Sequence, residues 1–167
     1  MSNKTTKGAE MLKELEAEAN ATRKCLERIP ESSFGWKPHE KSMPMGQLSV
    51  LVAEIPRWIQ NMVEKSEIDL ATFGFFQPKT TSDLVNRFDE NLKKATAALQ
   101  NVADDALAKP FSLKNGSQVL FTSPTIDNIG SSINHLVHHR GQLTVYMRLN
   151  NIPIPSIYGP SADERIF

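Results

Sequence analysis

The sequence has little of the material that several common classes of protein require. Among its 167 residues there is one cysteine, which excludes an intrachain disulfide and a cluster of thiolate metal ligands. Lysine and arginine together number 19, as do aspartate and glutamate, so no net positive charge is available to hold a phosphate backbone. We therefore expect no nucleic-acid partner.

Long hydrophobic runs are also missing. No stretch approaches the roughly 20 consecutive apolar residues that a membrane-spanning helix needs, so we expect no membrane partner. Residues 1–8 are polar and lack the apolar segment of a signal peptide. The lone Cys25 lies among helical positions, where we interpret it as a small packing residue, and it fits a reducing compartment. These features predict a cytoplasmic protein.

Aromatic residues make up only 7% of the chain, and the alternating β-branched pattern of strands is nearly absent. Apolar residues instead recur at intervals of three and four, as they do in amphipathic helices. We predict an all-α single domain over residues 1–167, built as a four-helix bundle. After a disordered lead-in of residues 1–7, the expected helices span about residues 8–29, 44–65, 82–100 and 125–150.

Several details of these segments carry their own predictions. Ser42 is a candidate cap for the second helix, and Pro56 within that helix predicts a kink. The connector at residues 104–124 is longer than adjacent antiparallel helices need, which indicates a long crossover connection. Its Lys114-Asn115-Gly116-Ser117 is compatible with a tight turn and a small two-stranded hairpin. In the loop at 66–80, three phenylalanines are interpreted as a lid on the core, with a pocket mouth or a partner surface as alternatives. They are Phe73, Phe75 and Phe76.

Three of the four histidines lie within the last predicted helix. His135 and His139 are four residues apart, so both rings project from one face and can offer two imidazoles to one transition metal. His138 points about 60° away from His135 on a helical wheel, which leaves it out of the pair. Two imidazoles make a weak site, and selective binding needs a third protein ligand. The fourth histidine, His39, lies in a loop, where a structural or solvent-facing role is the favoured interpretation.

Arg140 is the other unusual residue of this helix, because it falls inside the apolar arc. A buried guanidinium needs a carboxylate partner. Glu54, which also lies inside an apolar helix, is the predicted partner. The alternatives are that Arg140 reaches a substrate carboxylate or lies in a subunit interface.

Three segments of the chain, taken in order, carry a resemblance to a known family. They are Lys41-Ser42-Met43 leading to Leu51-Val52-Ala53-Glu54-Ile55-Pro56-Arg57-Trp58, then His135-Leu136-Val137-His138-His139-Arg140-Gly141-Gln142-Leu143, then Ile154-Pro155-Ser156-Ile157-Tyr158-Gly159-Pro160-Ser161. Together they resemble the DinB/YfiT-like superfamily of proposed metalloenzymes.

The resemblance implies a four-helix bundle with a crossover connection, paired as a homodimer. It also implies a divalent metal, Zn or Ni, on three histidines, two of which match His135 and His139. The third family histidine falls at the position of Leu51, and a leucine side chain cannot bind a metal.

Three interpretations of function remain open from the sequence. In the first, the metal site is incomplete, so the protein binds metal weakly through His135 and His139 or not at all. In the second, it is a metal-dependent thiol transferase or hydrolase that recruits His39, Glu54 or a water molecule as third ligand. In the third, it is a small-molecule-binding or stress-response protein that uses a pocket between the helices.

Overall fold

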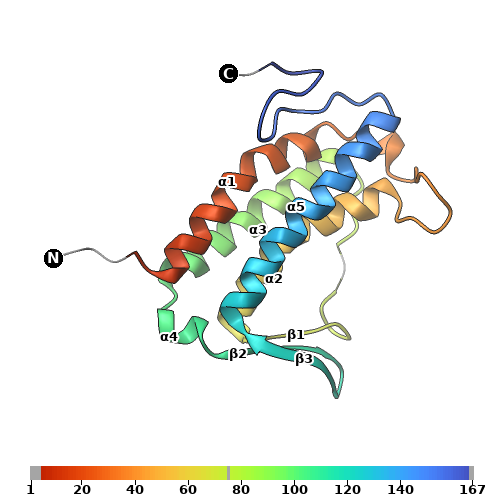
Figure 1. The fold of residues 1–167 in the computed structure, drawn as a ribbon. Helices are drawn as coiled ribbons and strands as arrows, with labels where there is room; N and C mark the ends of the chain where they lie inside the picture. Colours follow the sequence, from red (N-terminus) through yellow and green to blue (C-terminus); the bar gives the residue numbers. More distant parts are fainter. Residues whose placement is uncertain (1–4, 75, 166–167) are drawn as a thin grey trace.

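The computed structural model describes residues 5–74 and 76–165 of the chain. The predictions that concern Phe75 and the first four residues of the lead-in therefore lie outside the described residues. Four long helices are present, close to the positions expected from the sequence (Figure 1). They are α1 (Lys7–Glu27), α2 (Met45–Lys65), α3 (Thr81–Asn101) and α5 (Thr125–Leu149).

The shorter elements lie in the connections between these helices. A single 3-10 turn, η1 (Glu31–Ser33), follows α1, and a short helix, α4 (Asp104–Leu107), follows α3. The described residues also contain three strands: β1 (Glu67–Asp69), β2 (Pro110–Asn115) and β3 (Gln118–Pro124). None of the described helices is both long enough and apolar enough to cross a lipid bilayer.

The helix ends follow local capping chemistry in part. At the start of α3, the Thr80 hydroxyl accepts a hydrogen bond from the Asp83 backbone, and the Asp83 carboxylate accepts one from the Thr80 backbone, a complete capping box. Ser42 is not the cap of α2, because the helix begins after Pro44 and has no side-chain cap. Helix α2 continues through Pro56 without a break.

The four long helices are not wired as a simple up-and-down series. Helix α1 packs against α3 and α5, and α2 packs against the same two helices, while α1 and α2 hardly meet. Consecutive helices α1 and α2 therefore lie diagonally across the core. The connection from α3 to α5 passes through α4 and the β2–β3 hairpin.

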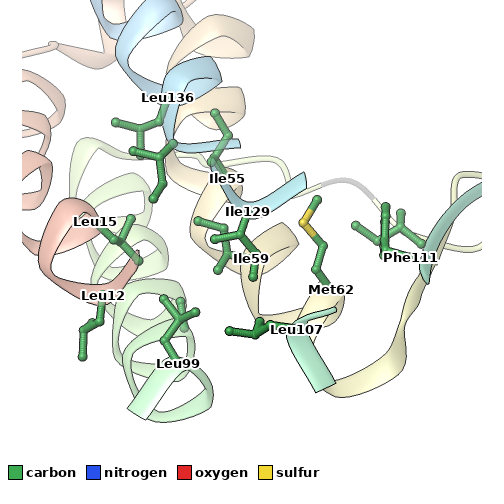
Figure 2. Packing of buried hydrophobic residues seen from close by; sticks show 13 residues of the cluster. Leu12, Leu15, Ile55, Ile59, Met62, Leu99, Leu107, Phe111, Ile129 and Leu136 are labelled. Carbon is green, nitrogen blue, oxygen red and sulfur yellow. The ribbon is translucent and has the colours of Figure 1, made fainter. Parts of the chain in front are cut away.

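The buried apolar residues form two clusters, one toward each end of the helices. Figure 2 shows the cluster nearer the sheet, where Leu15 of α1, Leu99 of α3, Ile59 of α2 and Ile129 of α5 converge. Phe111 of β2 extends this cluster toward the sheet. The core thus continues from the helices under the strands, so the sheet is part of the packed structure.

The prediction of a strictly all-α fold is wrong, because the strands form a three-stranded sheet in the order β1-β2-β3. The hairpin of β2 and β3 is antiparallel, as its turn indicated, and Gly116 adopts a φ of 60° that favours glycine. Strand β1 pairs in parallel with β2, with Ile68 opposite Leu113. A three-residue strand paired with a segment some 45 residues away leaves no periodic pattern in the sequence, which is why it was missed.

The predicted ion pair between Arg140 and Glu54 is also wrong. Arg140 is 1% exposed, and its guanidinium lies 2.5 Å from the carboxylate of Glu18 on α1. It also donates to the Glu18 carbonyl at 3.1 Å, to the Thr22 hydroxyl at 3.0 Å and to the Tyr158 hydroxyl at 2.8 Å. Arg140 therefore faces α1, whereas Glu54 on α2 is bonded to residues of α3. A helical wheel identifies a buried arginine but not the neighbour it faces.

The C-terminal segment lies over α1 and α5 as irregular chain, as its prolines predicted (Figure 1). Tyr158 donates to the Glu18 carboxylate at 2.8 Å and thereby closes the group around Arg140. Arg148 of α5 pairs with Asp163 at 2.7 Å, and Arg28 pairs with Glu164. The segment is thus tied to both helices by charged and polar contacts.

We expect replacement of the buried arginine to destabilise the protein. Arg140→Met should lower the free energy of unfolding by about 3 kcal/mol, because the Glu18 carboxylate then loses its buried partner. Arg148→Met on the same helix removes an exposed ion pair and should cost less than about 1 kcal/mol. Urea unfolding of the two variants beside the wild type measures both values. Equal, small losses in the two variants would contradict the assigned role of Arg140.

Candidate functional site

The two histidines singled out by spacing are in direct contact. The Nε2 atoms of His135 and His139 lie 2.6 Å apart, and the two ring centroids are 4.4 Å apart. His138 is exposed, and its ring meets that of His139 edge-on. The local geometry follows from the helix, because residues i and i+4 stand one turn apart on the same face.

A short chain of hydrogen bonds orients these rings. With the Gln142 amide placed as in the structure, its oxygen accepts from Nδ1 of His139 at 2.8 Å. The tautomer of His139 that donates from Nδ1 accepts at Nε2, where Nε2 of His135 donates. Burial lowers the pKa of His135, and the neighbouring His139 and His138 add to this effect. His135 is therefore neutral at physiological pH.

A cavity of about 510 Å³ opens beside His135. It is bounded by α2, by the first half of α5, by the sheet and by the loop that follows β1. Its volume lies within the range of roughly 300–1,000 Å³ that is typical of small-molecule sites. In the loop at 66–80, Phe73 packs on the core cluster and also lines the cavity. Phe76 lines the cavity as well. These two residues therefore have the pocket-lining role that the sequence left as an alternative to a core lid.

Leu51 and His135 line this same cavity, from α2 and α5 respectively. The position at which the resemblance places a third histidine therefore faces the space next to the histidine pair. Within residues 5–74 and 76–165, no group of three or more histidine, cysteine, aspartate or glutamate side chains is arranged to hold a metal ion. The side chains present do not fit the three-histidine site that the resemblance implies.

Glu54, one candidate for the third metal ligand, has its carboxylate oxygens occupied by hydrogen bonds from neighbouring side chains. Its carboxylate accepts from Arg57 at 2.8 Å, from Arg87 at 2.5 and 3.3 Å, and from the Asn91 amide at 3.1 Å. Burial alone would raise the pKa of Glu54, but these hydrogen bonds and the charge of Arg87 outweigh it and hold the pKa below its usual range. Glu54 is therefore an ionised structural carboxylate at neutral pH.

The arginines around Glu54 also support the loop over the cavity. Arg57 donates to the Phe73 carbonyl at 3.0 Å, and its guanidinium lies 4.1 Å from the centre of the Phe73 ring. Arg87 lies over the Phe76 ring at 5.3 Å. One buried carboxylate thus links α2 and α3 to two aromatic residues of the cavity wall.

The other sequence candidates lie outside this site. His39 is exposed in the turn before α2, where its Nδ1 accepts from the Lys41 backbone at 3.2 Å. Cys25 is fully buried in the second apolar cluster, and burial raises the pKa of its thiol to about 11. A thiol in that environment is protonated and inert at neutral pH, which supports a packing role.

Sequence reasoning missed most of the cavity wall. Trp58 stood out only as part of the segment that resembles the family, and Met62, Phe111 and Phe121 were not candidate site residues. The one available signal was the unusual gathering of aromatic residues in two connectors. It indicates buried aromatics but not which of them share a cavity.

Comparison with known proteins agrees with this architecture. The model of the DinB family matches residues 1–165, and the chain belongs to that family. The uncharacterised protein YrdA of Bacillus subtilis is 25% identical over 166 residues, which cover 92% of this chain and 89% of the relative.

Solved structures show the same fold. A crystal structure of YjoA, a DinB-like protein of Bacillus subtilis, superposes with a TM-score of 0.69 at 20% identity and covers 89% of this chain and 97% of its own. A DinB-like protein of Bacillus cereus gives the same score and identity, covering 89% of this chain and 95% of its own. A DinB-family protein of Exiguobacterium sibiricum gives 0.66 at 19% identity, covering 91% and 97%.

The role assigned to Glu54 predicts a stability that depends on pH. At neutral pH, Glu54→Gln should lower the free energy of unfolding by about 2 kcal/mol, because charge-assisted hydrogen bonds to Arg57 and Arg87 are weakened. The folded pKa is depressed, so the stabilisation is complete above the usual carboxyl pKa of about 4.3 and is lost as the pH falls through the folded pKa. Urea unfolding across this acid range should show the gap between wild type and variant narrowing.

A matched control is Glu67→Gln, which weakens the more exposed pair with Lys114. This variant should change the free energy of unfolding by less than about 0.5 kcal/mol at any of these pH values. A gap for Glu54→Gln that stays constant down to the lowest pH would show that the ionised carboxylate is not the source of the stabilisation.

Proposed function

We propose that this DinB-family protein binds a small molecule in the cavity between α2, α5 and the sheet, and that its divalent-metal site is incomplete. The observation that carries the proposal is the shared position of Leu51 and His135 on the cavity wall. Where the family resemblance calls for a third imidazole, this chain offers a hydrocarbon side chain. The space next to the histidine pair is thereby suited to an organic ligand.

The geometry of the histidine pair supports the same proposal. Two nitrogens bound to one tetrahedral zinc ion at 2.0–2.1 Å would lie about 3.3 Å apart. The Nε2 atoms of His135 and His139 are 2.6 Å apart, closer together than one shared tetrahedral ion would hold them. Each ring then uses on the other the nitrogen that a metal would need. Any zinc or nickel held by these two residues alone would be bound weakly.

A metal-dependent thiol transferase or hydrolase is the second candidate, favoured by the position of the histidine pair beside a cavity. It requires a third ligand, for which a water molecule, Glu54 or His39 is available in the sequence. Glu54 would first have to give up two arginines and an asparagine, and His39 is bonded within its own exposed turn. A bound metal would supply activation of a thiol or of water by lowering its pKa.

Two further expectations from the sequence belong to this proposal. We propose that the protein acts in the cytoplasm and that it pairs as a homodimer, as the family resemblance implies. Sedimentation equilibrium tests the second of these, with a mass near twice the 18.7 kDa of one chain as the expected result.

The metal half of the proposal is tested by restoring the third ligand. Protein prepared without a histidine tag should contain no stoichiometric zinc or nickel, whereas Leu51→His should bind one ion per chain and be more stable to heat when the ion is present. In the Leu51→His background, His139→Ala should abolish this binding. Leu51→Ala is the matched control, since it changes the same position without offering a ligand.

Stoichiometric metal in the wild type that is lost on His139→Ala would overturn the incomplete-site proposal and favour the second candidate. Failure of Leu51→His to bind metal would contradict the assignment of position 51 to the site. Elemental analysis of dialysed protein distinguishes these results.

The ligand half is tested by thermal unfolding with a panel of small molecules in the presence of a chelator. A ligand that binds only the folded protein raises the melting temperature, and the rise should vanish in Ser131→Trp, which fills the cavity from an exposed position on α5. A shift that survives this substitution would place binding outside the cavity.

A further inference from the structure

We infer that the ligand of this cavity is an uncharged, largely aromatic molecule with hydrogen-bonding groups along the one edge that faces α5. The inference rests on the proposed function and adds the chemical class of the ligand. It depends on how apolar, charged and polar side chains are distributed around the cavity wall.

Most of the wall is hydrocarbon. Helix α2 contributes Leu51, Trp58 and Met62, and the sheet contributes Phe111 and Phe121. These side chains come from different elements of the wall, so a ligand in the cavity contacts apolar atoms from both α2 and the sheet. Burying such a ligand is favourable at roughly 25 cal/mol for each Å² of apolar surface removed from water.

The aromatic share of the wall favours a ligand with flat rings. The rings of Phe111 and Phe121 lie 6.4 Å apart at a tilted angle, and Trp58 lies 5.5 Å from the ring of His135. Phe73 and Phe76 from the loop face the same space. Aromatic side chains prefer offset or edge-on ring partners at such separations, so a ring entering the cavity has several faces and edges to pack against.

No charge on the wall is available to a charged ligand. Among the lining residues of the described chain, Glu54 is the only carboxylate, and neither lysine nor arginine is present. Arg57, Arg87 and Asn91 already occupy the oxygens of Glu54. An anion would find no cation, and a cation would have to compete with two arginines, so in either case desolvation would be left uncompensated.

Apart from Glu54 and the exposed Gln47 on α2, the polar groups of the wall lie along one stripe of α5. Asn128, Ser131, Ser132 and His135 each lie three or four positions from two of the others, so they line the cavity from one face of the helix. This one-sided arrangement would orient a ligand that carries polar groups on one edge.

Two members of the stripe have hydrogen-bonding capacity to spare. The Ser132 side chain is buried. Within the described residues its hydroxyl makes one hydrogen bond, to the weak acceptor Sδ of Met62 at 3.8 Å. The Asn128 amide nitrogen donates to Ser123 and Pro124, while no hydrogen bond between described residues uses its oxygen. The stripe thus offers a donor and an acceptor to a hydroxyl or N–H group on the ligand.

A pair of fluorescent probes with one ring skeleton tests the inference. N-phenylnaphthylamine is uncharged and carries one N–H group, and anilinonaphthalene sulfonate is its sulfonated counterpart. Titrated into the wild-type protein with a chelator present, the uncharged probe should bind at least about ten-fold more tightly, because the sulfonate would be buried without a cation. Fluorescence enhancement on binding gives both dissociation constants.

Variants assign the binding to the cavity and to its polar stripe. Ser131→Trp should abolish binding of the uncharged probe, and Gln47→Trp fills the space from an exposed position on α2 if the first variant does not fold. Ser132→Ala should weaken binding about three- to ten-fold, the effect of one lost hydrogen bond. Val145→Ser, on an exposed face of α5 outside the cavity, is the control and should leave binding unchanged.

The outcomes separate the ligand class from the proposed function. If the sulfonate binds as tightly as the uncharged probe and Ser131→Trp abolishes both, the cavity binds ligands but the inferred class is wrong. If the uncharged probe binds equally well to both cavity-filling variants, or does not bind while the wider panel also gives no shift, the proposed function itself fails. Equal affinity of Ser132→Ala and wild type would contradict the role of the stripe.

Discussion

The buried carboxylate of Glu54 is the interaction on which the site depends. It lies on α2 within an apolar environment, and that position is tolerable only because Arg57, Arg87 and Asn91 surround it with donors. The same contacts connect α2 to α3 and hold two arginines against the faces of the Phe73 and Phe76 rings. Because Glu54 is satisfied in this way, it forms part of the cavity wall without offering its charge to the interior.

Glu54 and Arg140, which the sequence pattern suggested as partners, belong to two separate groups of ion pairs. Glu54 and Arg140 are both buried ionisable residues on neighbouring helices, and each was the natural partner for the other. In the structure, α5 turns Arg140 toward α1, and α2 turns Glu54 toward α3. Two separate buried ion pairs therefore tie the helices together, and the space between α2 and α5 is left to apolar side chains and the polar stripe.

The long helices and the hairpin could be predicted because each has a local signal: a period of three to four residues, and a glycine in a tight turn. Strand β1 and the cavity have no such signal. Ile68 and Leu113 are brought together by tertiary packing, and the residues of the cavity wall come from five separate segments. For the site, the spacing of His135 and His139 predicted two rings on one helix face, and their Nε2 atoms lie 2.6 Å apart. The direction faced by Arg140 could not be derived from one helix alone.

The contact of Tyr158 with Glu18 has a consequence for the order in which the molecule is assembled. These residues are 140 positions apart, and together with Arg140 they complete one hydrogen-bonded group. During synthesis α1 leaves the ribosome first, yet its buried face gains the arginine only when α5 has emerged and the tyrosine only when the last segment has followed. Completion of the polar contacts of α1 around Arg140 is therefore a late event, and it depends on contacts of very high sequence separation.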